Sequence, residues 1–309
     1  MIVAGIDIGT LTCRLLIADI GSDGGFREID SDRRILRLGE GVDQKGVLNI
    51  EAMERVIHVL GEWQKAIVRC HVEAIVLVAT SAVREANNQQ EFLERVKQET
   101  GFSIDVLSGN EEARRTLLGI KFGLPSEVKD YVGLDIGGGS TECIRISGDG
   151  QPIVTSLDIG VVRVTERCFQ SDPPHEQEVM AAERLIKDHI QPLQQSLSAH
   201  AHATLVGTAG TVTTLAAMAQ LTHYEPARIH NYWLTLEKIR ELEYTLRSRS
   251  RAQRLHLPGL EAGREGVIVA GTIIFRTIME MLGFARCLVS DYGLREGILI
   301  DLMNKKCNR

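Results

Sequence analysis

The feature that most constrains the fold is a short peptide that occurs twice. Residues 5–10 read Gly-Ile-Asp-Ile-Gly-Thr and residues 133–138 read Gly-Leu-Asp-Ile-Gly-Gly, and each leads into another β-rich run. Internal similarity of this kind indicates two related halves. Between them, residues 119–128 contain glycine, proline and mixed charges, which is typical of a domain boundary. We therefore predict two domains, residues 1–123 and 124–309.

Short β-rich runs alternate with segments of helical period, which favours an α/β fold class. Strands are expected at residues 3–8, 14–20, 74–78, 104–107, 132–136, 143–146, 204–206 and 287–289. Helices are expected at residues 53–67, 90–100, 176–199, 211–220, 236–247 and 264–282, with another beginning after Ser108 and one at the C-terminus. A chain of 309 residues, 44% of them hydrophobic, can bury a sizeable core.

The amino-acid composition limits which ligands the chain can be expected to bind and in which cellular compartment it can be expected to act. The six cysteines form no CxxC pair and no zinc-ligand spacing, which indicates reduced thiols in a cytosol. The N-terminus lacks a basic region and a cleavage site, and the longest later apolar run, 267–275, is too short to span a membrane. A net charge of −6 does not suit binding to duplex nucleic acid. We expect a cytoplasmic protein that binds neither a membrane nor duplex nucleic acid; a polyanionic ligand would need basic residues concentrated in one cleft.

Each repeated peptide contains an aspartate followed by a glycine-containing turn with threonine or serine side chains. The first runs from Asp7 through Gly9, Thr10 and Thr12; the second runs from Asp135 through Gly137, Gly138, Gly139, Ser140 and Thr141. Glycine lets backbone N–H groups approach phosphate oxygens, and a nearby aspartate can hold Mg²⁺. The alternative is a pair of tight hairpin turns without a ligand. Because the turn occurs twice with the aspartate in register, phosphate binding is favoured.

A third glycine segment contains Gly207, Thr208, Gly210 and Thr211. It follows a predicted strand and begins a predicted helix, so its backbone amides could hold an anion. An ordinary strand-to-helix turn with a threonine N-cap explains the same residues equally well. The segment lacks the Gly-Lys-Ser/Thr of a Walker A loop, as does the rest of the sequence.

Together these segments resemble the phosphate-binding elements of the actin and sugar-kinase (ASKHA) superfamily. More narrowly, the chain resembles the exopolyphosphatase/guanosine pentaphosphate phosphatase (Ppx/GppA) family, in that family's short form without a C-terminal HD-like domain. The segments that carry the resemblance are residues 5–20, 37–41, 79–87, 107–114, 134–142, 157–163, 206–214, 258–260, 264–271 and 290–297. The resemblance implies an actin-like, ribonuclease H-like two-domain fold with an interdomain cleft, in which the last helix, about 295–309, can join the first domain.

The resemblance also assigns roles. Glu112 is implied as the catalytic carboxylate, Arg84 as a phosphate-binding arginine, and Glu142 as an acidic contact to metal. The residues support the first role, because Ser108 and Glu111 form a capping box that leaves Glu112 available in the first helical turn. Without the resemblance, Glu112 would read as a carboxylate that complements the helix dipole. Likewise, Arg84 would read as a solvated surface arginine and Glu142 as a charge at a strand edge.

The implied reaction is Mg²⁺-dependent hydrolysis of the terminal phosphoanhydride of polyphosphate, with the 5′ phosphate of guanosine pentaphosphate as the second substrate. Asp7, Asp135 and Glu142 are the expected metal ligands, and the resemblance allows Mn²⁺ in place of Mg²⁺, K⁺ as a further cofactor, guanosine tetraphosphate as a ligand, and a homodimer. One departure is Leu11, which stands where the family usually has an asparagine. A kinase of the same superfamily and a non-catalytic sensor of guanosine tetraphosphate or polyphosphate remain alternatives.

Overall fold

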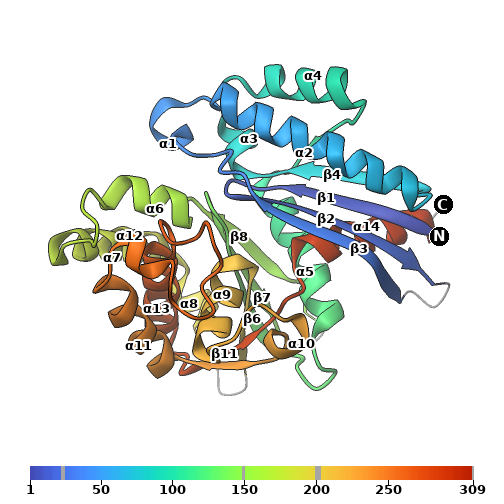
Figure 1. The fold of residues 1–309 in the computed structure, drawn as a ribbon. Coiled ribbons are helices and arrows are strands. Elements are labelled where there is room, and N and C mark those ends of the chain that lie inside the picture. The colour runs from blue at the N-terminus through green and yellow to red at the C-terminus, as the bar shows by residue number, and fades with distance from the viewer. Residues whose placement is uncertain (22–24, 148–149, 199–202, 308–309) are drawn as a thin grey trace. The chain divides into compact units, whose positions relative to one another are not determined.

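The computed structural model describes residues 1–21, 25–147, 150–198 and 203–307. It contains two compact units: residues 1–119 with 294–309 form unit 1, and residues 120–293 form unit 2. Each unit is an α/β structure built on its own sheet (Figure 1). The sequence predicts a boundary between residues 123 and 124 and allows the last helix, about 295–309, to join the first domain; the compact units change at 119–120 and at 293–294. The cleft implied by the resemblance stays a prediction.

Unit 1 is built on a five-stranded sheet in the order β3-β2-β1-β4-β5. The strands are β1 (Ile2–Ile8), β2 (Thr12–Ile20), β3 (Phe26–Ile35), β4 (Ala74–Ala79) and β5 (Asp105–Val106). The helices are α1 (Val42–Lys45), α2 (Ile50–Arg69), α3 (Ser81–Glu85), α4 (Gln89–Thr100), α5 (Gly109–Gly123), whose last turn lies in unit 2, and α14 (Leu294–Cys307).

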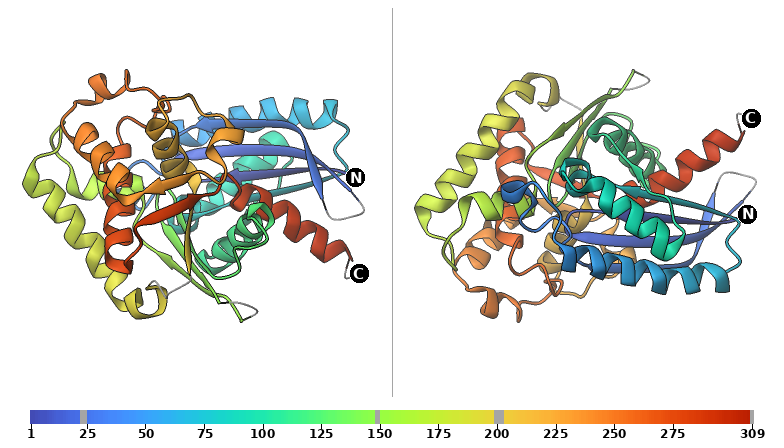
Figure 2. Two further views of the ribbon diagram at one scale, coloured as in Figure 1. Left: turned by 90° about the horizontal axis from the view of Figure 1, so that it is seen from below. Right: turned by 90° about the horizontal axis from the view of Figure 1, so that it is seen from above.

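Alternation along β1 sends its side chains to two different layers. Ala4, Ile6 and Ile8 join a core beneath α2 and α4, which pack against each other on that face (Figures 1 and 2). On the opposite face Val3 packs with Leu299 of α14, and a methyl group on Gly5 would lie only 3.0 Å from Leu299. Asp7 follows on this second face, at the end of the strand.

Unit 2 is built on a six-stranded sheet in the order β10-β11-β9-β6-β7-β8. The strands are β6 (Tyr131–Ile136), β7 (Thr141–Ile146), β8 (Ile153–Leu157), β9 (Thr204–Thr208), β10 (Trp233–Thr235) and β11 (Arg286–Val289). The helices are α6 (Val161–Cys168), α7 (Glu176–Ile190), η1 (Gln191–Leu193), α8 (Gln194–Leu197), α9 (Ala209–Ala219), α10 (Pro226–Ile229), α11 (Leu236–Arg247), α12 (Arg251–Arg254) and α13 (Ile268–Leu282).

The repeated peptide corresponds to a repeated topology. In unit 1, β1 is antiparallel to β2, β2 to β3, and β1 is parallel to β4. In unit 2, β6 is antiparallel to β7, β7 to β8, and β6 is parallel to β9. The predicted relationship between two halves is therefore confirmed.

Several predicted elements differ from the structure. Strands β3, β8 and β10 are not predicted from the sequence pattern, and all three lie at sheet edges. The helix predicted at 176–199 is interrupted after Ile190, where Pro192 removes an amide donor; its predicted end at residue 199 lies outside the described residues. The helix predicted from residue 264 begins at Ile268. In the part of the chain that the structure describes, no helix has the length and apolarity to cross a membrane.

Candidate functional site

The two repeated turns have the same geometry. The amide of Gly9 donates to the carbonyl of Thr12 at 3.0 Å, and the amide of Gly137 donates to the carbonyl of Ser140 at 3.0 Å. A side chain at Gly9 or Gly137 would lie 2.8 or 3.0 Å from that same carbonyl oxygen. Both positions therefore need glycine for packing, whatever the turn binds.

In unit 2, the carbonyls of the Gly137–Ser140 turn are bonded from behind by α6. The amides of Val161 and Val162 donate to the carbonyls of Gly137 and Gly138 at 3.0 and 2.8 Å. Gly160 makes this approach feasible, because a methyl group there would lie 2.3 Å from the carbonyl oxygen of Gly138. Thr141, the last predicted phosphate contact in this turn, is buried and donates its hydroxyl to Ile159.

The amides of the same turn are open. Within the described residues, no hydrogen bond acceptor faces the N–H groups of Gly138, Gly139 and Ser140. Partly buried amides without protein acceptors are uncommon and call for a ligand or water. Successive open N–H groups in a turn form a concave site for an anion. This turn therefore has the donors that phosphate binding requires.

The turn in unit 1 follows the same plan. The carbonyl of Thr10 accepts from Gly39 at 2.8 Å, and the carbonyl of Leu11 accepts from Leu36 at 2.9 Å. Among the residues described, the amides of Thr10 and Leu11 have no acceptor. The Leu11 side chain is buried, so this departure from the family pattern removes an amide side chain and adds to the core. Thr12 begins β2 and is half-buried.

Unit 1 also brings together Glu112 and Arg84, which lie far apart in the sequence. Arg84, in α3, donates through Nη1 to Glu112 Oε2 at 3.0 Å and to the carbonyl of Leu107 at 2.8 Å. Glu112 is 7% exposed in the first turn of α5. The capping box predicted beside it is confirmed, because Ser108 and Glu111 exchange hydrogen bonds. Glu111 thus has a capping role that Glu112 does not share.

Two of the three predicted metal ligands are neighbours in unit 2. Asp135 on β6 and Glu142 on β7 are directly opposite in register, so both carboxylates lie on one face of the sheet. Glu142 is 1% exposed and accepts a hydrogen bond from the Ser156 hydroxyl at 2.8 Å. Like charges directly opposite one another repel, and a divalent cation between them would offset that repulsion.

The donor set fits Mg²⁺ better than a metal that needs a full protein cage. Mg²⁺ commonly binds one or two carboxylates and completes its shell with water and substrate phosphates. Within the described ranges, no cluster of three or more His, Cys, Asp or Glu side chains could hold a metal by itself. Asp7, the third predicted ligand, lies in unit 1, directly opposite Arg14 of β2.

The third glycine segment differs from its predicted form. There is no intervening loop, because β9 continues through Thr208 and α9 begins at Ala209. Gly207 lies within the strand, where a side chain would meet the Cys287 sulfur at 3.0 Å, and the Thr208 hydroxyl donates to the carbonyl of Tyr292. Packing and hydrogen bonding within unit 2 therefore explain why glycine stands at 207 and threonine at 208. Thr208 nevertheless lies directly beside Asp135 across the β6–β9 ladder.

One basic residue near this segment was missed by sequence reasoning. The buried guanidinium of Arg264 lies against Gly210, since a methyl group there would be 2.0 Å from Nη2. Thr211, next to it, is buried against Gly271. The position of Arg264 within the resembling segment 264–271 was the available signal, but only the fold places its charge at the beginning of α9.

The cysteines beside the two turns have no features of nucleophiles. Cys13 and Cys143 are fully buried, and burial raises the pKa of each thiol, that of Cys143 to about 12. Both are packing residues.

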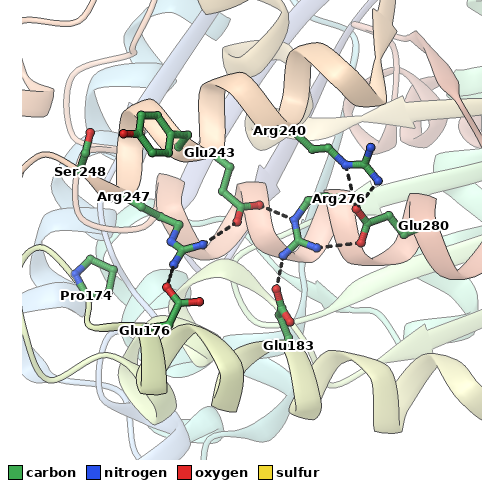
Figure 3. A pocket seen from close by; sticks show the side chains of 10 residues that line it. Pro174, Glu176, Glu183, Arg240, Glu243, Arg247, Ser248, Arg276 and Glu280 are labelled. Carbon is green, nitrogen blue, oxygen red and sulfur yellow. Dashed lines mark hydrogen bonds and ion pairs between the residues drawn. The ribbon is translucent and has the colours of Figure 1, made fainter.

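The cavity in Figure 3 lies elsewhere in unit 2, between α7, α11 and α13, and has a volume of about 570 Å³. None of the predicted site residues lines it. Arg276 is at its centre and donates to Glu243, Glu183 and Glu280, one carboxylate for each nitrogen of its guanidinium. Arg247 bridges Glu243 and Glu176. These ion pairs connect three helices to one another.

Comparison with known proteins finds relatives that match nearly the whole length of the chain. A family model described as the Ppx/GppA phosphatase family matches residues 16–306. Exopolyphosphatase 2 of Mycobacterium tuberculosis is 36% identical over 314 residues, which cover 97% of this chain and 98% of that protein. The crystal structure of the Aquifex aeolicus Ppx/GppA family member is 37% identical, with a TM-score of 0.82 and coverage of 99% and 98%.

A crystal structure of an exopolyphosphatase from Cytophaga hutchinsonii has a TM-score of 0.91 at 27% identity and covers 99% of this chain and 98% of that one. The predicted actin-like, two-domain fold class is therefore confirmed. The agreement extends over nearly all of the sequence rather than over the glycine turns alone. By sequence and by fold, the chain belongs to the Ppx/GppA phosphatase family.

Proposed function

We propose that this protein is an exopolyphosphatase, which hydrolyses the terminal phosphoanhydride bond of inorganic polyphosphate and releases orthophosphate. Its membership of a phosphatase family supports hydrolysis of phosphoanhydrides in general. The observation that carries the proposal is the Gly137–Ser140 turn, with three consecutive open amides beside the opposed carboxylates of Asp135 and Glu142. Amides that bind phosphate oxygens next to carboxylates that suit Mg²⁺ are the usual parts of a phosphoryl-transfer site.

Each unit contributes separate chemistry. In unit 1, Glu112 accepts the proton of an attacking water and orients that water toward the terminal phosphorus. Arg84 holds the carboxylate and supplies positive charge for the phosphoryl oxygens. The amides of Thr10 and Leu11 are further donors. In unit 2, the three turn amides bind phosphate oxygens, and Arg264 adds charge beside Gly210.

Asp135 and Glu142 would hold Mg²⁺, which when bound neutralises charge on the phosphates and on the leaving oxygen. Asp7, at the equivalent position of the repeated turn in unit 1, is proposed as a further metal ligand. We further propose that the protein acts in the cytoplasm on free polyphosphate. No disulfide joins Cys13, Cys70, Cys143, Cys168 or Cys287 to another of these five cysteines, as expected for reduced thiols.

The test is release of orthophosphate from long-chain polyphosphate with Mg²⁺, in the native protein and in Glu112→Gln. Glutamine keeps the shape and hydrogen bonds but cannot take a proton, so kcat should fall by about 10³-fold. The matched control is Glu111→Gln, because glutamine still completes a capping box. That variant should stay within about twofold of the native protein.

Activity that survives in Glu112→Gln would contradict the role of this carboxylate. Release from guanosine pentaphosphate but not from polyphosphate would replace the proposed substrate. Transfer of phosphate only to an added acceptor would show a kinase instead, and ligand binding without any release would show a sensor.

A further inference from the structure

Arg163 is a buried cation that the proposed chemistry has not used. It lies in the first turn of α6 and is 7% exposed. Its Nε donates to the carbonyl of Gly139 at 2.9 Å. A positive charge at a helix N-terminus is unfavourable with respect to the helix dipole. This placement therefore needs a compensating reason, and the bond to the glycine turn supplies one.

The bond from Arg163 is the third of three hydrogen bonds to consecutive carbonyls of the glycine turn. Carbonyls 137 and 138 are held by the backbone amides of Val161 and Val162, whereas carbonyl 139 is held by the side chain of Arg163. In a trans peptide unit the C=O of one residue and the N–H of the next are coplanar and point in opposite directions. Each bonded carbonyl thus fixes the direction of the following amide.

The three bonds correspond one to one with the three open amides. The first two orient the N–H groups of Gly138 and Gly139, and Arg163 orients the N–H of Ser140. The first two depend only on backbone, so a substitution at 161 or 162 leaves the donor in place. The third depends on one side chain.

We propose that Arg163 is a positioning residue of the phosphate site, which holds the Ser140 amide toward the bound phosphate by its hydrogen bond to the Gly139 carbonyl. The proposal deepens the proposed function and rests on it. Arg163 acts from behind the turn, through the peptide unit.

The test measures binding as well as turnover. Arg163→Met keeps the length of the side chain and removes the donor, and we expect it to weaken binding of inorganic tripolyphosphate with Mg²⁺ about 10-fold, the effect of losing one hydrogen bond to a charged group. Arg163→Lys retains a donor and a charge and should recover most of that loss. Calorimetric titration in a Glu112→Gln background gives these constants without heat from hydrolysis of the ligand.

The control is Arg254→Met. Arg254 is also a buried arginine of unit 2, and its Nε likewise donates to a backbone carbonyl, that of Leu246, at 2.9 Å. Its loss should lower stability without changing the tripolyphosphate affinity. If both methionine variants lose affinity equally, general destabilisation explains the effect and the proposal is wrong.

Amide resonances give a direct readout. In the native protein, titration with inorganic phosphate should shift the ¹H–¹⁵N signals of Gly138, Gly139 and Ser140. In Arg163→Met the Ser140 response should be lost selectively. Loss of all three responses together, or an unchanged Ser140 response, would refute the positioning role.

The two proposals can fail separately. A native protein that binds tripolyphosphate but releases no phosphate would overturn the hydrolase, and the binding constants would still decide the role of Arg163. A native protein that binds no tripolyphosphate would overturn both.

Discussion

The contact between Gly160 and the glycine turn provides a quantitative test of how the proposed phosphate site is supported. In Gly160→Ala, the new methyl carbon would lie 2.3 Å from the carbonyl oxygen of Gly138 and 2.4 Å from its carbon. An ordinary carbon–oxygen contact is about 3.3 Å or longer, so the two segments must separate by about 1 Å. Neither side can yield by rotating a flexible side chain, because the atoms struck belong to the backbone.

This separation has a cost that follows from the hydrogen bonds. The bonds from Val161 and Val162 to the turn measure 3.0 and 2.8 Å, and an extra 1 Å removes both. A buried polar group left without its partner costs about 1–3 kcal/mol, so two broken bonds amount to roughly 2–6 kcal/mol. We expect the free energy of unfolding of unit 2 to fall by that amount and phosphate release to fall with it, because the turn amides lose their direction.

The assay is urea unfolding followed by circular dichroism, with hydrogen exchange of peptides from residues 120–293 to assign the transition to unit 2. The matched control is Gly266→Ala in the same unit, where the nearest atom is the Arg251 guanidinium carbon at an ordinary 3.5 Å. That substitution should be neutral or stabilise by up to ~1 kcal/mol. A Gly160→Ala midpoint equal to that of Gly266→Ala would refute the proposed close support of the turn by α6.

Two further predictions concern unit 2 away from the turn. Hydrogen bonds to Glu178, first from the Ser171 hydroxyl and then from backbone amides, lower the pKa of its carboxyl to about 2. The stability that the Glu178 carboxylate contributes is therefore present above its ordinary pKa and lost as the pH falls toward 2. The difference in urea midpoint between the native protein and Glu178→Gln should shrink over that range. A difference that stays constant would contradict the lowered pKa of Glu178. In Arg276→Met, three carboxylates lose their common partner within a largely buried network, so thermal unfolding should show a free energy of unfolding lower by about 3–5 kcal/mol. The control is Lys238→Met, which removes an exposed ion pair and should lower the free energy of unfolding by only about 0–1 kcal/mol. Similar losses in both variants would contradict the stabilising role of the network.

The pKa of Arg276 illustrates why this network is expected to matter. Burial alone lowers the pKa of a guanidinium, but the hydrogen bonds and charges of Glu243 and Glu183 outweigh burial and raise it. Hydrogen bonds and charges from Arg240 and Arg276 lower the pKa of Glu280, against the effect of its own burial. Arg254 is another arginine of unit 2 that is buried and paired, in its case with Asp172.

Much of the candidate site could be located from the sequence because its parts are local. The Asp-Xaa-Gly turns are contiguous peptides, and the capping box that separates Glu111 from Glu112 lies within four residues. The assignments to catalysis, phosphate and metal stay predictions. What the fold adds is pairing over long sequence separations, such as Arg84 with Glu112 and Arg264 with Gly210.

The sequence by itself determined the α/β class, the central strands and the relationship between the two halves, because buried strands need unbroken apolar runs and tight turns need glycine. It did not determine the edge strands β3, β8 and β10. β3 carries six charged residues among ten, and a strand exposed along one side has little need of an apolar pattern. Only tertiary structure decided which amides stay open. That depends on where a distant helix places its own donors, and in this chain α6 and the side chain of Arg163 bond the carbonyls from behind.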